Sequence, residues 1–442
     1  MVKNRDLART ARRIFDEALK TADPGNAVRE TVRTEGRFLF ARNERNGIDL
    51  TRPLYAVAIG KAAYPMAAAF EKAIGTYLTA GVVSGTENVP GGQDLGPKWE
   101  KFSGGHPLPN EESLGAARAC LAMLDRACAE KAGVVFLISG GGSAMMELPR
   151  DPAVTLDDLR NLNHALVTSG ASIAEINSVR RSVSAVKGGG LALRAPDSPQ
   201  ISLIISDTRA GDVSSVASGP SLIPDDTVPD PLTVVDKYSL TGSLPPSLLR
   251  SLEQDSVEPS FRLTDNRAYV LLDNKTMVTR AAEIAEGLGF VTGYDPAEHD
   301  EMIEEGIVSL FTRALDFKRS VPPGKPVCYI SGGEFGCEVK GSGVGGRNCE
   351  SALRAALRAE KNPELHNFAF LSAGTDGIDG NSSAAGGVVD ENTLESAIAR
   401  GLDPREYLTN SDSFTFLKKL NAAIETGPTG TNVRDVRIIL SA

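Results

Sequence analysis

The sequence predicts an α/β protein in which parallel strands alternate with helices. Short, near-continuous apolar runs recur along the chain, as expected for parallel strands that are covered on both faces. A helical pattern follows most of these runs, for example at 62–75 after the run at 54–60. This alternation is typical of βαβ units. The clearest predicted strands are residues 54–60, 80–85, 134–140, 201–207, 268–273, 327–333 and 368–374.

A segment rich in Ser and Pro divides the chain into two expected domains. It covers residues 238–262, and linkers between domains often have this composition. With 442 residues, the chain is long enough for two domains. We therefore expect a larger first domain at 1–250 and a smaller α/β second domain at 251–442.

Composition and charge argue against several classes of protein. The formal net charge of −10 disfavours nucleic acid as the main partner. No apolar run approaches the roughly 20 residues that span a bilayer, so no membrane association is expected. The five cysteines include no Cys-x-x-Cys pair, which favours reduced thiols and a cytoplasmic location over disulfides or a zinc site.

The strand predicted at 134–140 leads directly into a glycine-rich turn, which we call the first glycine loop. Glycines at such a position let backbone N–H groups turn toward an anion such as a phosphate. A P-loop carries a lysine directly after its glycines, and this loop has none. The positive charge for a bound phosphate must therefore come from elsewhere in the chain. The predicted phosphate-binding residues of this loop are Ser139, Gly140, Gly141, Gly142 and Ser143.

A second glycine loop, residues 341–348, precedes another helical pattern. Anions bind readily at helix N-termini because the first N–H groups are unpaired. The loop also satisfies the dinucleotide fingerprint G-x-G-x-x-G, but the acid in the matching role, Asp376, comes too late in the chain. A third glycine loop lies at 427–432. The predicted phosphate-binding residues of the second loop are Gly341, Gly343, Gly345, Gly346 and Asn348.

Four basic residues are candidates to neutralise an anionic ligand. Lys61 follows the strand at 54–60, at the edge where open α/β sheets bind ligands. Lys187 lies beside three glycines and is predicted to contact phosphate. Arg347 stands directly after the glycines of the second loop. Arg180 fits a carboxylate or phosphate clamp, because a guanidinium binds oxyanions through two parallel bonds, although a surface position suits it equally.

Several acidic residues lie at or just after predicted strand ends, beside glycines. Mg²⁺ bound with a nucleotide takes one or two carboxylates and keeps several waters. Aspartates are common in turns and at helix N-caps, so each residue alone also fits that role. As a set, they are consistent with a site that binds a metal–nucleotide complex and activates a hydroxyl group. They are Asp207, Asp212, Glu334, Asp376 and Asp379.

A collinear series of motifs covers essentially the whole chain. It includes GKAAYPMA at 60–67, GHPLPN at 105–110, SGGGSAM at 139–145, SDTRAGDVSSVASGP at 206–220, GSGVGGRN at 341–348, AGTDGIDG at 373–380 and TGPTGTNVRD at 426–435. This series resembles the glycerate 2-kinase family, whose second half is the MOFRL domain. The resemblance implies a large Rossmann-like first domain, a smaller α/β second domain, and an active site between them.

The resemblance also implies a reaction, namely ATP-dependent phosphorylation of the 2-hydroxyl of D-glycerate to 2-phosphoglycerate, with Mg²⁺. The proposed catalytic lysine and arginine of the family correspond to Lys61 and Arg347. The expected partners are a nucleotide and a small hydroxy acid, and the expected assembly is a monomer or a homodimer. The remaining expected roles are Asp207 as the carboxylate that accepts the hydroxyl proton or as a metal ligand, Asp212 and Glu334 as metal ligands, and Arg180 and Asp376 as substrate contacts.

Some positions depart from the family pattern. Cys349 replaces a glutamine, Ser383 stands where an acid is expected, and Arg209 adds a charge to the loop at 206–212. Two other interpretations therefore stay open. One is an NAD(P)-dependent hydroxypyruvate reductase, which rests on the dinucleotide fingerprint, and the other is a non-catalytic homologue that binds nucleotide or sugar acid.

Overall fold

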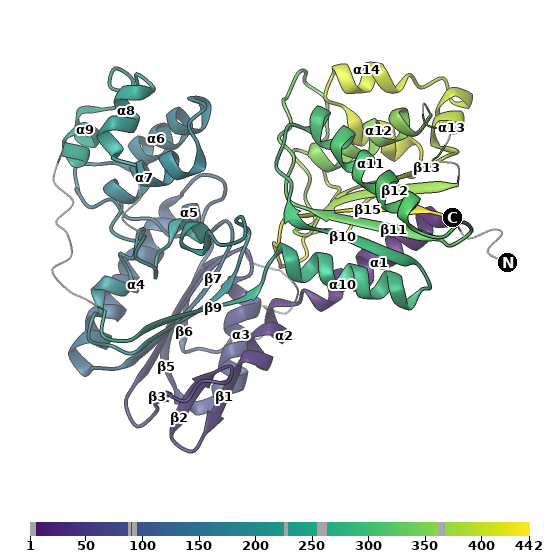
Figure 1. The fold of residues 1–442 in the computed structure, drawn as a ribbon. Coiled ribbons are helices and arrows are strands. Elements are labelled where there is room, and N and C mark those ends of the chain that lie inside the picture. Colours follow the sequence, from purple (N-terminus) through teal and green to yellow (C-terminus); the bar gives the residue numbers. More distant parts are fainter. Residues whose placement is uncertain are drawn as a thin grey trace. The chain divides into compact units, whose positions relative to one another are not determined.

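The computed structural model describes residues 6–86, 90, 95–224, 229–253, 263–360, 362, 364 and 367–442. The chain forms two compact units (Figure 1). The first, here called the N-terminal unit, is Pro24–Leu271. The second, the C-terminal unit, combines the segment before Pro24 with Leu272–Ala442.

The N-terminal unit is built on a six-stranded sheet with the order β6-β5-β4-β7-β8-β9. The neighbouring pairs from β6 to β8 are all parallel, as the sequence predicts. Every residue of β4, β7 and β8 is buried, which explains their unbroken apolar runs. The strands are β4 (Leu54–Gly60), β5 (Leu78–Gly85), β6 (Trp99–Phe102), β7 (Gly133–Ser139), β8 (Gln200–Ile205) and β9 (Asn266–Leu272).

Helices cover this sheet and extend beyond one of its ends. The helices α3 (Ala63–Ile74) and α4 (Glu111–Glu130) contact its strands. Four further helices share a separate hydrophobic cluster and gather near the short helix α5 (Gly142–Met145) (Figure 1). These four are α6 (Leu156–Thr168), α7 (Ile173–Val183), α8 (Pro231–Lys237) and α9 (Pro246–Glu253). The unit also contains α2 (Pro24–Thr31) and an antiparallel sheet of β1 (Val32–Glu35), β2 (Phe38–Ala41) and β3 (Ile48–Asp49).

The C-terminal unit contains a mixed sheet with the order β10-β11-β15-β12-β13-β14. Only β10 and β11 are parallel, and the other neighbouring pairs are antiparallel. The second half is therefore an α/β fold of a different kind from the first. The strands are β10 (Val291–Glu298), β11 (Val327–Gly332), β12 (Phe368–Gly374), β13 (Gly386–Asp390), β14 (Ala423–Ile424) and β15 (Asp435–Ser441).

The helices of this unit include one from the start of the chain. The N-terminal helix α1 (Leu7–Thr21) packs on α10 (Asn274–Gly287) and contacts β12, β13 and β15. Its apolar face, with Ala11, Ile14 and Phe15, is completely buried. The remaining helices are α11 (Ile303–Ser320), α12 (Arg347–Glu360), α13 (Thr393–Ala399), α14 (Pro404–Thr409) and α15 (Ser413–Lys419).

The two units differ from the expected domains 1–250 and 251–442 at both ends. The helix α1 belongs with the C-terminal unit, because its amphipathic face needs the sheet of that unit to be buried. The strand β9 completes the N-terminal sheet, although it follows the Ser- and Pro-rich segment. The described part of that segment, up to residue 253, packs in the N-terminal unit through Leu244, Leu248 and Leu252. Residues 254–262 lie outside the described residues.

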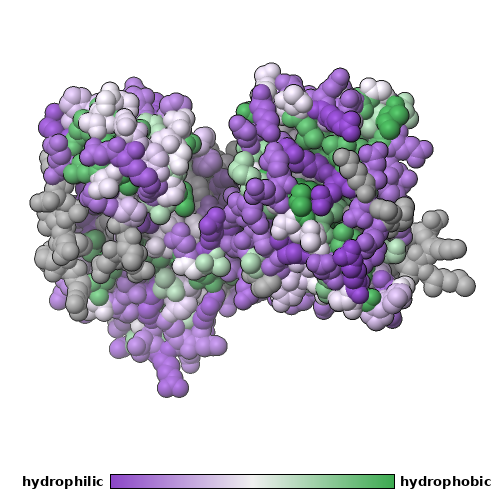
Figure 2. Space-filling view, turned by 45° about the horizontal axis from the view of Figure 1, so that its top comes forward, coloured by the Kyte–Doolittle hydropathy of each residue, from purple (hydrophilic) through white to green (hydrophobic). Residues whose placement is uncertain are grey.

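Hydrophilic residues dominate the visible face of the molecule, with only small hydrophobic patches among them (Figure 2). Within the described ranges, no helix is both long enough and apolar enough to cross a membrane. The five cysteines are free thiols, as their spacing predicts.

Candidate active site

The first glycine loop joins β7 to α5 in the N-terminal unit. Gly141 has a φ of 80°, a left-handed conformation that glycine adopts without strain. The loop is bound to the connection between β4 and α3, because Ala62 N donates to Ser139 Oγ (2.9 Å) and Lys61 N donates to the Gly140 carbonyl (2.9 Å). In the described part of the chain, the N–H groups of Gly141, Gly142 and Ser143 have no hydrogen-bond acceptor. The loop therefore keeps the donors that a phosphate needs.

Three side chains from other loops surround this turn. A Cβ atom placed on Gly140 would lie 1.9 Å from Asp207 Oδ2. One placed on Gly141 would lie 3.1 Å from Lys61 Cγ and 3.2 Å from His106 Cδ2. The structure thus brings Lys61 and Asp207 to the first glycine loop, because parallel strands β4, β7 and β8 all end at this edge of the sheet.

His106 is the site residue that the sequence reasoning missed. It is one of four histidines and belongs to no His-x-x-x-His or Ser/His/Asp spacing. Its position in the loop GGHPLPN, between glycines and prolines, was the available signal. Such loops carry functional residues more often than elements of the core do.

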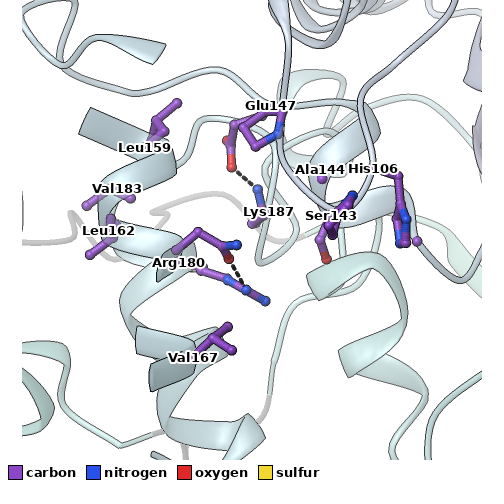
Figure 3. Close-up of a pocket in the computed structure, with 14 residues that line it drawn as sticks. His106, Ser143, Ala144, Glu147, Leu159, Leu162, Val167, Arg180, Val183 and Lys187 are labelled. Carbon is purple, nitrogen blue, oxygen red and sulfur yellow. Dashed lines mark hydrogen bonds and ion pairs between the residues drawn. The ribbon is translucent and has the colours of Figure 1, made fainter. Parts of the chain in front are cut away.

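A pocket of about 260 Å³ opens beside the turn (Figure 3). One part of its wall is polar and contains Gly141, Ser143 and Arg180. The other part is apolar and comes from the helices α6 and α7 through Leu159, Leu162, Val167 and Val183.

Lys187 lines the same pocket and forms a buried ion pair with Glu147 (Figure 3). The second oxygen of Glu147, Oε1, accepts from Ser184 Oγ (2.5 Å) and from Leu148 N (2.9 Å). Burial lowers the pKa of the Lys187 ammonium to about 7. The predicted phosphate ligand Lys187 is thus paired with a protein carboxylate, a partner that the sequence analysis did not identify.

Arg180 and Asp212 have different surroundings. Arg180, on α7, donates from Nη2 to the side-chain oxygen of Asn163 on α6. Burial lowers the pKa of its guanidinium from the ordinary value. Asp212 follows β8 in the same loop as Asp207, and its charge acts on Arg181. Of the predicted substrate and metal residues, Arg180 thus lies in the pocket wall, and Asp212 lies in the loop that also carries Asp207.

The second glycine loop, in the C-terminal unit, is closed by the protein's own oxygens. Its N–H groups donate to acceptors in two other loops, the one between β12 and β13 and the one between α14 and α15, and the first N–H groups of α12 donate to Asp379. Within the described residues, the second glycine loop therefore lacks the row of unbonded N–H donors that its glycines predict. The bonds run from Ser342 N to Asn410 Oδ1 (3.3 Å), Gly343 N to Asn410 O (2.9 Å), Val344 N to Asp412 Oδ1 (2.9 Å), Gly345 N to Asn381 Oδ1 (2.8 Å), Asn348 N to Asp379 Oδ1 (3.0 Å) and Cys349 N to Asp379 Oδ2 (2.7 Å).

The other glycines of this loop, and Asn348, have packing roles. A Cβ on Gly341 would lie 2.4 Å from Asn410 Oδ1, and one on Gly346 would lie 2.5 Å from Asp379 Oδ1. The Asn348 side chain is buried and accepts from Ser372 Oγ (2.6 Å). Burial raises the pKa of Asp379 to about 6. These glycines let α12 and its neighbouring loops approach one another closely.

Arg347 is held by two carboxylates at the start of α12. Its Nε donates to Asp435 Oδ2 (2.5 Å) and its Nη2 to Asp435 Oδ1 (3.1 Å), and Nη2 also lies 2.7 Å from Glu334 Oε1. These charges hold the pKa of the guanidinium above its ordinary value, although its burial acts in the opposite direction. Arg347 and Glu334 line a pocket of about 640 Å³ within the C-terminal unit. Asp376 accepts from Ile378 N (3.1 Å) in a tight turn.

The expected metal ligands are divided between the two units. Asp207 and Asp212 belong to the N-terminal unit, whereas Glu334 belongs to the C-terminal unit and pairs with Arg347. Across the described ranges, no group of three or more His, Cys, Asp or Glu side chains could hold a metal ion. Magnesium that arrives with a nucleotide needs only one or two carboxylates, and Asp207 beside the first glycine loop fits that requirement.

Comparisons with known proteins match both halves of the chain. Residues 10–253 match a domain of unknown function, DUF4147, and residues 327–435 match the MOFRL family. The D-glycerate 2-kinase of Thermotoga maritima is 36% identical over 98% of each chain. A putative hydroxypyruvate reductase of Agrobacterium vitis is 33% identical over 97% of this chain and 93% of that one. The crystal structure of the Thermotoga maritima glycerate kinase matches with a TM-score of 0.82 at 34% identity and covers 99% of each chain.

The fold and these matches together define a two-domain protein with a DUF4147 domain and a MOFRL domain. The chain belongs to the glycerate kinase family.

Proposed function

We propose that this protein is an ATP- and Mg²⁺-dependent kinase that transfers phosphate to the 2-hydroxyl of D-glycerate or a closely related small hydroxy acid. The observation that carries the proposal is the first glycine loop. Its N–H groups at Gly141, Gly142 and Ser143 have no acceptor among the described residues, and Lys61 and Asp207 flank the turn. The family relationship supports the same reaction class.

The chemistry of phosphoryl transfer requires mainly positioning and neutralisation of charge. In the proposed complex, the N–H groups of the first loop bind phosphate oxygens and the Lys61 ammonium neutralises the transferred group. Asp207 accepts the proton of the substrate hydroxyl. Magnesium would be held by Asp207 or Asp212 with the nucleotide phosphates, and when bound it would neutralise their charge.

The acid substrate is assigned to the pocket beside this loop. A volume of about 260 Å³ suits a small molecule, and Arg180 supplies a guanidinium for a carboxylate. Arg347 lies in the C-terminal unit. Its proposed role in neutralising the transferred phosphate rests on the family motif, and the double variant Arg347→Ala/Asp435→Asn tests it.

The reductase alternative rests on the dinucleotide fingerprint, and the relative from Agrobacterium vitis is named a putative hydroxypyruvate reductase. The geometry of the second glycine loop disfavours it. A dinucleotide fingerprint turns directly from a strand into a helix, with its N–H groups free for the pyrophosphate. Here residues 333–340 separate the end of β11 from Gly341, and most of the loop N–H groups are already bonded.

Two assays separate these functions. Incubation with ATP, Mg²⁺ and D-glycerate should release ADP, and the NMR coupling between phosphorus and protons in the product should place the phosphate on carbon 2. NADH oxidation with hydroxypyruvate should not exceed the background rate. Absence of ADP release with a panel of hydroxy acids would contradict the kinase proposal, and binding without turnover would favour a non-catalytic homologue.

A further inference from the structure

The basic residues of this protein differ in what holds them. Lys187 is paired with the carboxylate of Glu147, and Arg347 is paired with Asp435 and Glu334. Arg180 is held instead by a neutral amide, the side-chain oxygen of Asn163. A neutral acceptor fixes the direction of a guanidinium without cancelling its charge, whereas a carboxylate does both.

The packing of α6 against α7 fixes this contact. Asn163 lies on α6 between Leu162 and Leu166, both of which are buried. Arg180 follows Val179, which is buried on α7 in the same hydrophobic cluster. Because the apolar neighbours on both helices are locked in one core, the amide and the guanidinium are presented to each other at the pocket wall.

The charges around the pocket leave Arg180 as the anchor for an anion. Among the described residues that line the pocket, Glu147 is the only carboxylate, and it is engaged by Lys187. Much of the remaining wall is apolar, through Leu159, Leu162 and Val167. A ligand with one carboxylate therefore finds the Arg180 guanidinium without a competing carboxylate. A second carboxylate would lose water without gaining a partner once the nucleotide phosphates occupy the N–H groups of Gly141 and Ser143.

We propose that Asn163 is a positioning residue that keeps the Arg180 guanidinium directed and uncompensated, so that the pocket selects acids with a single carboxylate. This inference rests on the proposed function, because it assigns the acid to this pocket. It adds to that function a residue that governs binding of the acid and a limit on the class of acid.

The substitution Asn163→Asp tests the inference by placing a carboxylate against Arg180. Asn163→Ala removes the acceptor without adding charge. Asn161→Asp is the matched control, because Asn161 lies on the same helix and is exposed to solvent. Circular dichroism would establish that the three variants are folded.

The first measurement is the affinity for D-glycerate by isothermal titration calorimetry with Mg²⁺ and a non-hydrolysable ATP analogue present, so that the N–H groups of the first glycine loop are occupied. We expect Asn163→Asp to weaken binding about tenfold or more and Asn163→Ala about threefold, with Asn161→Asp unchanged. Tartronate, which carries two carboxylates, should bind the wild type at least about tenfold more weakly than D-glycerate. In turnover assays KM for D-glycerate should rise in parallel, whereas kcat and KM for ATP should stay within about twofold.

The outcomes separate this inference from the kinase proposal. If Asn163→Asp binds D-glycerate as the wild type does, or if the wild type binds no monocarboxylate, the positioning role is wrong. Equal binding of tartronate and D-glycerate would overturn the single-carboxylate limit. If the wild type binds D-glycerate but releases no ADP, the kinase proposal fails while the binding comparison still decides the role of Asn163.

Discussion

The two glycine-rich loops of this chain have different surroundings, although each lies between a strand and a helix. In the first loop, the N–H groups of Gly141 to Ser143 have no acceptor among the described residues, and Lys61 and Asp207 lie beside the turn. In the second loop, the N–H groups donate to Asn381, Asn410 and Asp412.

The difference shows that glycine content alone does not identify a phosphate site. Glycine permits close backbone approach, and the approaching group is either a ligand or another part of the protein. At the second loop, the carboxylate of Asp379 already occupies the N-terminus of α12. The comparison predicts that substitutions at the first loop reduce catalysis, whereas those at the second reduce stability.

The largest expected effect is that of Lys61→Ala. If its ammonium neutralises the transferred phosphoryl group, kcat should fall by about 10³-fold or more, with little change in the melting temperature. Steady-state ADP release and thermal unfolding measure the two quantities. Alanine substitution of Lys72, an exposed residue on α3, provides a matched control. Turnover by Lys61→Ala near that of the wild type would contradict the catalytic role proposed for Lys61.

Arg347→Ala should show a mixed effect. Asp435 is almost fully buried, and loss of its partner should reduce the free energy of unfolding by about 3–5 kcal/mol. The double variant Arg347→Ala/Asp435→Asn removes both charges and should recover much of this stability. If Arg347 is catalytic, the double variant should still turn over about 100-fold more slowly than the wild type. Recovery of both stability and turnover would make Arg347 a structural residue.

Alanine substitutions at one glycine of each loop compare the loops directly. Gly141→Ala forces a left-handed conformation on alanine, at about 1–2 kcal/mol, and brings its Cβ to 3.1 Å from Lys61 Cγ. We expect kcat/KM for ATP to fall about 10- to 100-fold. Gly343→Ala places a Cβ 2.4 Å from the Asp412 Cβ and should instead lower the free energy of unfolding by about 1–3 kcal/mol. The reverse pattern in kinetics and thermal unfolding would contradict the comparison.

The smallest expected effect is a pH dependence of D-glycerate binding in the pocket beside the first glycine loop. Burial lowers the pKa of Lys187 to about 7, so its proton is lost as the pH rises through that value. Glu147 then remains as an uncompensated carboxylate, and KM for D-glycerate should rise about threefold to tenfold. The unfolded chain keeps this proton up to about 10.5, so the free energy of unfolding should increase with pH between these values. Glu147→Gln/Lys187→Gln lacks both groups and should flatten the KM profile.

By itself, the sequence predicted the strands β4, β5, β7, β8 and β9 of the N-terminal sheet and the family of the chain, but not the short edge strand β6. Buried parallel strands are recognisable because both of their faces must be apolar, as in β4 and β7. The same regularity located Lys61 and Asp207 at the ends of strands, because the carboxyl ends of parallel strands share one edge. These features depend on residues that are close together in the chain, and local patterns are therefore sufficient to predict them.

The tertiary structure alone decided which candidate groups have protein partners. The ion pair of Lys187 and Glu147 joins residues 40 positions apart, and the bond from Ser342 to Asn410 spans 68 positions. The placement of α1 in the C-terminal unit likewise depends on a sheet formed much later in the chain. Hydrogen bonds and ion pairs between distant residues leave no periodicity in the sequence, because each depends on how complete elements pack. The sequence therefore identified two glycine loops, and only the fold distinguished the open loop from the closed one.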